Sequence, residues 1–485
     1  MKKQPNILIL CSDQQRFDTL GCYNNSFTNT PNIDTIAKEG VLFEKAYAQN
    51  PVCTPSRSSF MTGRYPRTTR CRQNGADIPE DEILFSKILS DNGYTCGLSG
   101  KLHLSAADPI TGDRIERRIN DGFHVFEWSH DSSLRHASNA YHRWLKGNKI
   151  KYEVSCSNES IYVDYGMPAE WHLSKFCADK AIEFIQTNES FDNPWMFMVN
   201  FFDPHPPFDP PREYFEQYLD KINDLPLPNY KEGELETKPY IQKLEHLEAI
   251  NGRRTFQGKV HYYPVSEMKD RDHKYIKAAY YAMCELIDIQ VGRILYVLKE
   301  SGQYEDTIIV YMSDHGELLG DHGMYYKGPF FYDPCIHVPY IFSYKKEFLQ
   351  NTRISSTTEL IGLAPTLLQA AGIDIPGSMQ AKSMYDILCG REEARDCDVY
   401  CEYYNSLPWN NPHIYATMLS DARYKLIVYH NINEGELYDM TEDPNESVNL
   451  WSSSKMASIK LNMLVRLTNK MAYTIDPLPE RRSAW

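Results

Sequence analysis

The chain has 485 residues, 42% of them hydrophobic, which is enough to bury a large core in about two or three domains. Its formal net charge of −14 argues against a general nucleic-acid-binding protein, although a few local lysines and arginines can still form a pocket for an anionic substrate. No apolar stretch reaches the length that a membrane span requires.

The first twenty residues lack a signal-peptide pattern, because Met-Lys-Lys-Gln-Pro-Asn leads directly into an apolar run. We therefore expect a cytoplasmic protein as the chain is given, or a periplasmic or secreted one if a leader has been removed. The 12 cysteines are scattered without a C-x-x-C pair, so free thiols are expected rather than a zinc ribbon or a disulfide framework. Only Cys397 and Cys401 are spaced so that a local pair on a strand or loop is an alternative to free thiols.

Residues 6–11 form a nearly continuous apolar run, which is typical of a strand buried on both faces of a parallel sheet. Polar residues follow at once. Among them, Asp13 and Gln14 place two oxygen ligands side by side at the end of the strand. A hard divalent cation accepts such carboxylate and amide oxygens.

The twelve residues from position 53 read Cys-Thr-Pro-Ser-Arg-Ser-Ser-Phe-Met-Thr-Gly-Arg. Thr54 is expected to cap a short helix that stops at Gly63. Cys53 would then lie at the mouth of this helix, where unpaired backbone N–H groups favour an anion. Arg57, about one turn further along, is near enough to reach the same place. The structural alternative is a core cysteine beside a surface arginine.

Three later segments repeat the pattern of an apolar strand followed by polar side chains. These strands are predicted at 94–98, 195–202 and 307–312, and they end in Gly100-Lys101-Leu102-His103, Asp203-Pro204-His205 and Ser313-Asp314-His315-Gly316-Glu317. Helices are predicted at 84–92, 174–187 and 275–301. This alternation predicts a large, mostly parallel α/β sheet between helices, with the polar clusters converging at the carboxyl ends of the strands.

The second half of the chain changes in character. Residues 216–274 are polar and interrupted by prolines, and we expect them to form an insertion over the sheet. A boundary near 372–377 would divide a catalytic α/β domain at 1–375 from a smaller C-terminal α+β domain at 376–485. Short strands at 399–404, 415–420 and 424–429, and a helix at 455–473, predict a small antiparallel sheet there. The loop with Trp409 and His413 can either stack on a sugar ring or pack structurally.

Asp314 and His315 supply a second adjacent pair of cation ligands, at the end of the fourth strand. On its own, this stretch is more typical of a turn in which an aspartate caps the following helix. Together with Asp13 and Gln14 at a separate strand end, it favours a metal site.

The run at 53–64, with proline two residues and arginine four residues after the cysteine, resembles the signature of the type I sulfatases. These are the formylglycine-dependent members of the alkaline phosphatase superfamily. The resemblance covers almost the whole chain, including the opening strand, the segments at 100–103, 204–206 and 313–317, Lys327 and the segment at 436–444. It implies an alkaline-phosphatase-like fold and hydrolysis of sulfate monoesters, with Cys53 oxidised to formylglycine by a maturation enzyme.

The resemblance also implies roles for individual residues. The metal ligands would be the hydrated formylglycine at position 53 together with Asp13, Gln14, Asp314 and His315. Arg57 would hold the formylglycine, and Lys101 and Lys327 would grip the sulfate oxygens. His103 would hydrogen-bond the geminal diol, and His205 would lie near the leaving oxygen.

Two positions depart from many relatives, which carry a second aspartate where Gln14 stands and an asparagine where His315 stands. Fewer carboxylate ligands weaken Ca²⁺ binding, and an imidazole shifts the preference toward Mg²⁺ or Mn²⁺. The resemblance nevertheless favours Ca²⁺ as the single divalent metal ion. An Asp-His pair at this place also occurs in branches that cleave phosphonate or phosphate esters.

The expected substrate is a sulfated sugar, with aryl sulfate or choline sulfate as small-molecule alternatives. Two other functions stay open: a phosphonate monoester or phosphodiester hydrolase on the same scaffold, and a non-catalytic carbohydrate-binding relative in which Cys53 stays unmodified. The sequence does not indicate an oligomeric state.

Overall fold

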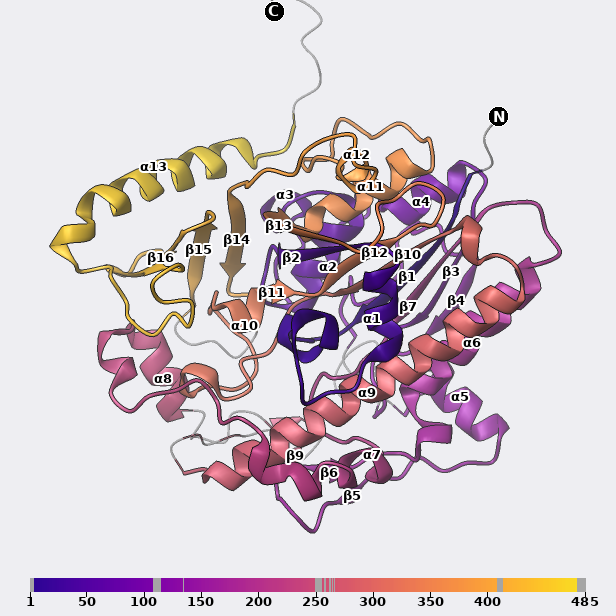
Figure 1. The fold of residues 1–485 in the computed structure, drawn as a ribbon, viewed down its shortest axis with the longest axis horizontal. Coiled ribbons are helices and arrows are strands. Elements are labelled where there is room, and N and C mark those ends of the chain that lie inside the picture. Colours follow the sequence, from indigo (N-terminus) through magenta and orange to yellow (C-terminus); the bar gives the residue numbers. More distant parts are fainter. Residues whose placement is uncertain are drawn as a thin grey trace, which may run out of the picture.

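The central element of the fold is a nine-stranded sheet that lies between two layers of helices (Figure 1). The computed structural model describes residues 4–107, 115–133, 135–248, 255, 256, 259, 260, 263, 265, 267–407 and 413–477. Trp409, which was predicted to belong to an aromatic loop, lies outside the described residues.

The strands of the large sheet lie in the order β11-β2-β12-β10-β1-β7-β3-β4, and β13 pairs with β2. Their bounds are β1 Asn6–Ser12, β2 Val41–Tyr47, β3 Thr95–Gly100, β4 Val125–Trp128, β7 Trp195–Asn200, β10 Thr307–Ser313, β11 His337–Val338, β12 Tyr340–Ser343 and β13 Thr352–Glu359. The five strands from β10 to β4 are parallel, whereas β12 runs antiparallel to β10 and β2. The prediction of a large, mostly parallel sheet is confirmed.

The register of the parallel strands brings the four predicted polar segments to one edge. Ser12 lies opposite Ser313 at the ends of β1 and β10, and Asn200 at the end of β7 lies opposite both Cys11 and Gly100. Since parallel strands share their carboxyl ends, the segments that follow them leave the sheet side by side.

Helices cover both faces of this sheet. Phe197 and Val199 of β7 face a core shared with α1, α6 and α9, whereas Met198 between them faces the core under α2, α4 and α11 (Figure 1). Burial on both faces explains why these strands are continuous apolar runs. The helix bounds are α1 Pro31–Lys38, α2 Cys53–Thr62, α3 Pro66–Thr69, α4 Phe85–Asp91, α5 Ala140–Gly147, α6 Leu173–Asn188, α7 Arg212–Glu216, α8 Tyr240–Glu248, α9 Asp270–Glu300, α10 Asp333–Ile336, α11 Leu363–Ala370, α12 Tyr385–Leu388 and α13 Ala457–Tyr473.

The helix that carries Cys53 forms as expected, but it begins two residues earlier than predicted. Cys53 is the first residue of α2, and Val52 rather than Thr54 is its N-cap. The Thr54 hydroxyl has no hydrogen-bond partner among the described residues, while the Thr54 N–H donates to Asn74 Oδ1 at 3.0 Å. The capping prediction was therefore wrong, because a side chain from a neighbouring loop satisfies the helix end. Gly63 ends the helix at φ +67°, as predicted.

A four-stranded antiparallel sheet forms the C-terminal part, in the order β14-β15-β16-β17. Its strands are β14 Val399–Tyr404, β15 Tyr415–Ser420, β16 Tyr424–Tyr429 and β17 Glu434–Asp439, so three of the four were predicted and β17 was not. α13 covers one face through Met463 and Leu467 (Figure 1). The other face packs on Phe330 and Tyr332, in the segment that follows Lys327.

The described residues of the segment predicted as an insertion, 216–274, add no strand to the large sheet. It contains α8 and the short ribbon of β8 Thr255–Phe256 and β9 Lys259–Val260, whereas α7 ends where the segment begins. A second ribbon, β5 Ser155–Cys156 with β6 Asp164–Tyr165, lies earlier in the chain. Beyond the proposed boundary, Tyr385 and Leu388 of α12 still pack in the core of the large sheet. The domain limits at 375 and 376 stay a prediction.

All 12 cysteines have free thiols, Cys397 and Cys401 included. Within the described part of the chain, we find no helix with both the length and the apolar character needed to cross a bilayer.

Candidate active site

Ligand atoms from four buried side chains meet at the carboxyl edge of the large sheet. Asp13 follows β1, Asp314 and His315 follow β10, and Cys53 opens α2; one ligand atom from each lies within 4.8 Å of all the others. Two carboxylates, an imidazole and a sulfur atom can surround one cation at this spacing. The structure therefore brings together four of the five predicted metal-ligating positions, and the fifth, Gln14, is the direct neighbour of Asp13.

The hydrogen bonds of His315 leave one nitrogen for a cation. Its Nδ1 lies 2.8 Å from the Gly316 carbonyl oxygen, to which a ring N–H donates. Nε2 then faces the site, 3.1 Å from Cys53 Sγ and 3.8 Å from Asp314 Oδ1. A histidine whose second ring nitrogen is held by a backbone carbonyl is the usual arrangement of a metal ligand.

Gln14 adopts a left-handed backbone conformation, with φ at +65°. This conformation lets its backbone N–H donate to Asp314 Oδ1 at 3.0 Å, while its side-chain Oε1 accepts a hydrogen bond from the Lys327 ammonium. The amide oxygen therefore already faces a positive charge. The donor set of two carboxylates, an amide oxygen, an imidazole and residue 53 fits a divalent cation.

Arg57 lies beneath the carboxylates and links them. Its Nε donates to Asp314 Oδ2 at 2.8 Å and its Nη2 to Asp13 Oδ2 at 3.1 Å. Its Nη1 donates to the Lys101 carbonyl oxygen at 2.9 Å. Burial alone would lower the pKa of this guanidinium, but Asp314 and Asp13 raise it above its usual value. The planar fork of arginine suits such a bridge, which holds the two carboxylates in a fixed arrangement.

Two lysines approach residue 53, and their surroundings differ. Lys101 Nζ lies 2.6 Å from Asp13 Oδ2 and 3.8 Å from Cys53 Sγ. Lys327 Nζ lies 3.1 Å from Cys53 Sγ and 3.2 Å from His315 Nε2. Burial raises the pKa of the Cys53 thiol, but Lys101, Lys327 and His315 together lower it well below its usual value. The site is thus built to hold negative charge at position 53.

His103 and His205 reach the same place from β3 and β7. Cys53 raises the pKa of each imidazole, but other groups outweigh it. Burial and Lys101 lower the pKa of His103, and burial and Lys327 lower that of His205. Both imidazoles are therefore neutral near neutral pH in the resting site. All ten predicted site residues lie in this one cluster.

Two residues near His103 were not predicted from the sequence. The buried Glu116 carboxylate accepts the backbone N–H groups of His103 at 2.9 Å and Ser105 at 3.1 Å, and so holds His103 at φ +56°. The ring of His130 stands edge-on to that of His103, with their centroids 4.7 Å apart. Neither residue belongs to a local pattern, because each meets His103 only through the fold.

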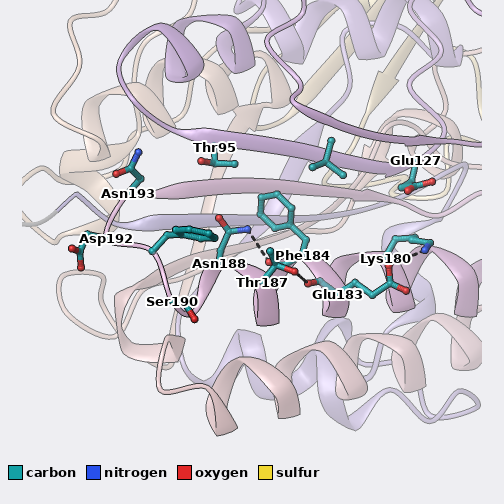
Figure 2. A pocket seen from close by; sticks show the side chains of 12 residues that line it. Thr95, Glu127, Lys180, Glu183, Phe184, Thr187, Asn188, Ser190, Asp192 and Asn193 are labelled. Atoms are coloured by element: carbon teal, nitrogen blue, oxygen red, sulfur yellow. Dashed lines mark hydrogen bonds and ion pairs between the residues drawn. The ribbon is translucent and has the colours of Figure 1, made fainter.

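A surface hollow elsewhere on the molecule is not part of this cluster (Figure 2). It is lined by Thr95 and Val125, the first residues of β3 and β4, and by α6 residues that include Lys180, Glu183 and Phe184. These are the amino ends of the parallel strands, so the hollow lies at the edge opposite to Asp13 and Asp314.

Several known proteins resemble this chain in sequence or in fold. The profile of the Sulfatase family matches residues 5–373, and that of "N-sulphoglucosamine sulphohydrolase, C-terminal" matches 320–473. An arylsulfatase of Clostridium perfringens is 28% identical over 468 residues, covering 93% of this chain and 91% of that protein. An N-acetylglucosamine-6-O-sulfatase of Bacteroides thetaiotaomicron is 26% identical, covering 98% and 88%. Among solved structures, a phosphonate monoester hydrolase from Silicibacter pomeroyi superposes with a TM-score of 0.82 at 23% identity, covering 98% and 96%.

Proposed function

This chain belongs to the sulfatase family and is a sulfuric ester hydrolase, and we propose that it removes sulfate from a sugar by means of a formylglycine made from Cys53. The observation that carries the proposal is the buried cluster of Asp13, Cys53, Asp314 and His315, within 4.8 Å of one another and flanked by two lysines. A formylglycine-generating enzyme would be the partner that prepares residue 53.

Asp13, Gln14, Asp314 and His315 would hold one divalent cation together with residue 53. When bound, that cation would lower the pKa of a hydroxyl at residue 53 and polarise the sulfate oxygens. We propose Ca²⁺, for which the two carboxylates and the amide oxygen are suitable ligands, with Mg²⁺ and Mn²⁺ as the alternatives. The hydrate of an aldehyde offers a second hydroxyl that a serine lacks, which suits a nucleophile that must afterwards release sulfate.

The cationic side chains bind and orient the substrate anion. Of the two lysines, Lys327 lies closer to residue 53 and would contact the sulfate oxygens directly, whereas Lys101 Nζ lies 3.8 Å from Cys53 Sγ. Arg57 makes its hydrogen bonds to Asp13 and Asp314, so its part is to fix the cation ligands rather than to grip sulfate. Fixed positive groups of this kind stabilise the charge that shifts between oxygens in the transition state.

The two histidines would move protons. His205, whose Nδ1 lies 2.6 Å from the Pro206 carbonyl oxygen, would give a proton to the leaving oxygen from its other ring nitrogen. Because its pKa is lowered, it must first take up a proton, which the arrival of a sulfate anion favours. His103, which its lowered pKa keeps neutral, would accept a proton from the hydroxyl of residue 53.

A sugar as the group that carries the sulfate is supported by the relative from Bacteroides thetaiotaomicron, which is named for N-acetylglucosamine-6-O-sulfate. The phosphonate monoester hydrolase shares the scaffold at 23% identity, which keeps phosphonate esters in the experiment as the competing substrate.

The experiment is a substrate panel with protein co-expressed with a formylglycine-generating enzyme. Mass spectrometry of the Cys53 peptide measures the converted fraction. The panel contains defined sulfated saccharides, 4-nitrophenyl sulfate and a phenyl phosphonate monoester, with Cys53→Ala as the control. We expect the highest kcat/KM on a sulfated saccharide. A higher value on the phosphonate would make the chain a phosphonate hydrolase, and no turnover by fully converted protein would favour a binding role.

A further inference from the structure

Glu317 lies directly behind the cation ligands and is completely buried, yet no role in the site has been assigned to it so far. Its Oε2 accepts a hydrogen bond from the side-chain Nε2 of Gln14. Its Oε1 accepts the backbone N–H of Leu319 at 2.9 Å and that of Tyr326. One carboxylate thus touches a predicted cation ligand and the residue next to Lys327.

The Gln14 amide is caught between two groups of opposite character. Lys327 donates to its Oε1, while Glu317 accepts from its Nε2. An ammonium group offers only donors, and an ionised carboxylate offers only acceptors. Turning the amide over would place its NH₂ against the ammonium and its oxygen against the carboxylate. The chemistry of both neighbours therefore fixes the same orientation, with the oxygen toward the cluster.

The same carboxylate holds the loop that carries Lys327. Leu319 and Tyr326 both have left-handed backbones, at φ +51° and +67°, which residues with side chains rarely adopt. Their N–H groups both point at Glu317 Oε1. The carboxylate closes this loop at its two ends and so presents Lys327, one residue further on, to residue 53.

We propose that Glu317 is a positioning residue: it keeps the Gln14 amide oxygen turned toward the cation and ties the Lys327 loop to that same ligand. This inference rests on the proposed function, in which a divalent cation is held by Gln14 and its neighbours. An aspartate or glutamate ligand presents an oxygen whichever way it turns, whereas an amide needs a partner that selects its oxygen. Glu317 supplies that selection.

The test exchanges the two groups. In Glu317→Gln, residue 317 can donate as well as accept, so Gln14 can turn its oxygen away from the cation. Loss of such an outer hydrogen bond typically weakens metal binding by about 10–100-fold, which is the expected effect on the Kd for Ca²⁺. Gln14→Glu alone places two carboxylates face to face and should also bind weakly. The double variant Glu317→Gln/Gln14→Glu again pairs a donor with an acceptor and adds a third carboxylate ligand, so it should bind Ca²⁺ at least as tightly as the wild type.

Affinity is measured by equilibrium dialysis and by the Ca²⁺-dependent shift of the unfolding temperature, so neither readout needs turnover. Glu436→Gln is the matched control, because Glu436 is 1% exposed and accepts hydrogen bonds from Tyr332 and Tyr429 in the C-terminal sheet. It should leave Ca²⁺ affinity unchanged.

Wild-type affinity in Glu317→Gln would overturn the inference, as would a folded double variant that binds no better than Gln14→Glu. If Glu317→Gln does not fold, the comparison of Gln14→Glu with the double variant decides alone. A wild-type protein that binds none of Ca²⁺, Mg²⁺ and Mn²⁺ would remove the cation from the proposed function and this inference with it. If instead the wild type binds Ca²⁺ and Glu317→Gln binds it equally well, only this inference fails and the proposed function stands.

Discussion

The two lysines beside residue 53 are expected to respond differently to neutralisation. Lys101 Nζ lies 2.6 Å from Asp13 Oδ2, so its charge is largely compensated before a substrate arrives. Lys327 has no carboxylate oxygen within 4.0 Å among the residues that the structure describes, and its Nζ is 3.1 Å from Cys53 Sγ. Lys327→Met should therefore impair catalysis more than Lys101→Met.

The size of the effect follows from the distance. A substrate oxygen held beside residue 53 would lie roughly 4 Å from Lys327 Nζ, where two unit charges interact by about 4 kcal/mol at an effective dielectric constant of about 20. This energy corresponds to about 10³-fold in rate. Removal of one fixed donor to a developing negative charge typically lowers kcat by about 10²–10³-fold, which agrees. We expect Lys327→Met to lower kcat/KM by that amount.

The assay is kcat/KM for 4-nitrophenyl sulfate at saturating Ca²⁺, corrected for the formylglycine content of each variant. Lys101→Met should lose less activity and should bind Ca²⁺ more tightly, because Asp13 is released from its ammonium partner. A loss in Lys101→Met that equals or exceeds that in Lys327→Met would refute this reasoning. A kcat/KM of Lys327→Met within about tenfold of the wild-type value would also refute it. In that case Lys101, whose charge Asp13 compensates, would be enough to stabilise the sulfate oxygens.

Three further predictions concern the same cluster. Cys53→Ala should abolish turnover while its circular dichroism spectrum stays that of the wild type; undiminished activity would exclude residue 53 as the nucleophile. Arg57→Met breaks two buried ion pairs, so the free energy of unfolding of the cation-free protein, measured in urea, should fall by about 3–5 kcal/mol. Ca²⁺ should then stabilise this variant by more than it stabilises the wild type. An unchanged urea midpoint would contradict that expectation. Burial and Lys327 lower the pKa of His205 below about 6.5, so kcat/KM for a saccharide sulfate should fall as the pH rises through that lowered pKa and the proton is lost. His205→Gln should flatten this limb of the pH profile, and a limb that persists in the variant must belong to another group.

The strand ends of the site could be predicted from the sequence because two local signals coincide there. Continuous apolar runs marked β1, β3, β7 and β10, and the polar residues that follow them sit at the shared edge of a parallel sheet. No such signal marks Glu116 or His130, because each meets His103 only in the folded chain. Glu317 belongs to the polar segment after β10, but its contact with Gln14 exists only in the folded chain.

The C-terminal sheet shows a second limit of sequence reasoning. β17 reads Glu-Gly-Glu-Leu-Tyr-Asp, a composition that is depleted in strands, and it was not predicted. Its central glutamate, Glu436, is nevertheless buried, because Tyr332, Tyr429 and Tyr438 donate hydrogen bonds to it. Tertiary partners therefore overrode the local preference, as Asn74 did at the start of α2.

The depth of α2 has a consequence for the order of events in the life of this protein. Every residue from Cys53 to Thr62 is buried, and Cys53 itself is 1% exposed. A maturation enzyme could not reach this thiol, or the residues of α2 that follow it, in the folded chain. The proposed conversion of Cys53 would therefore have to precede the burial of α2, and a molecule that folded first would keep its thiol.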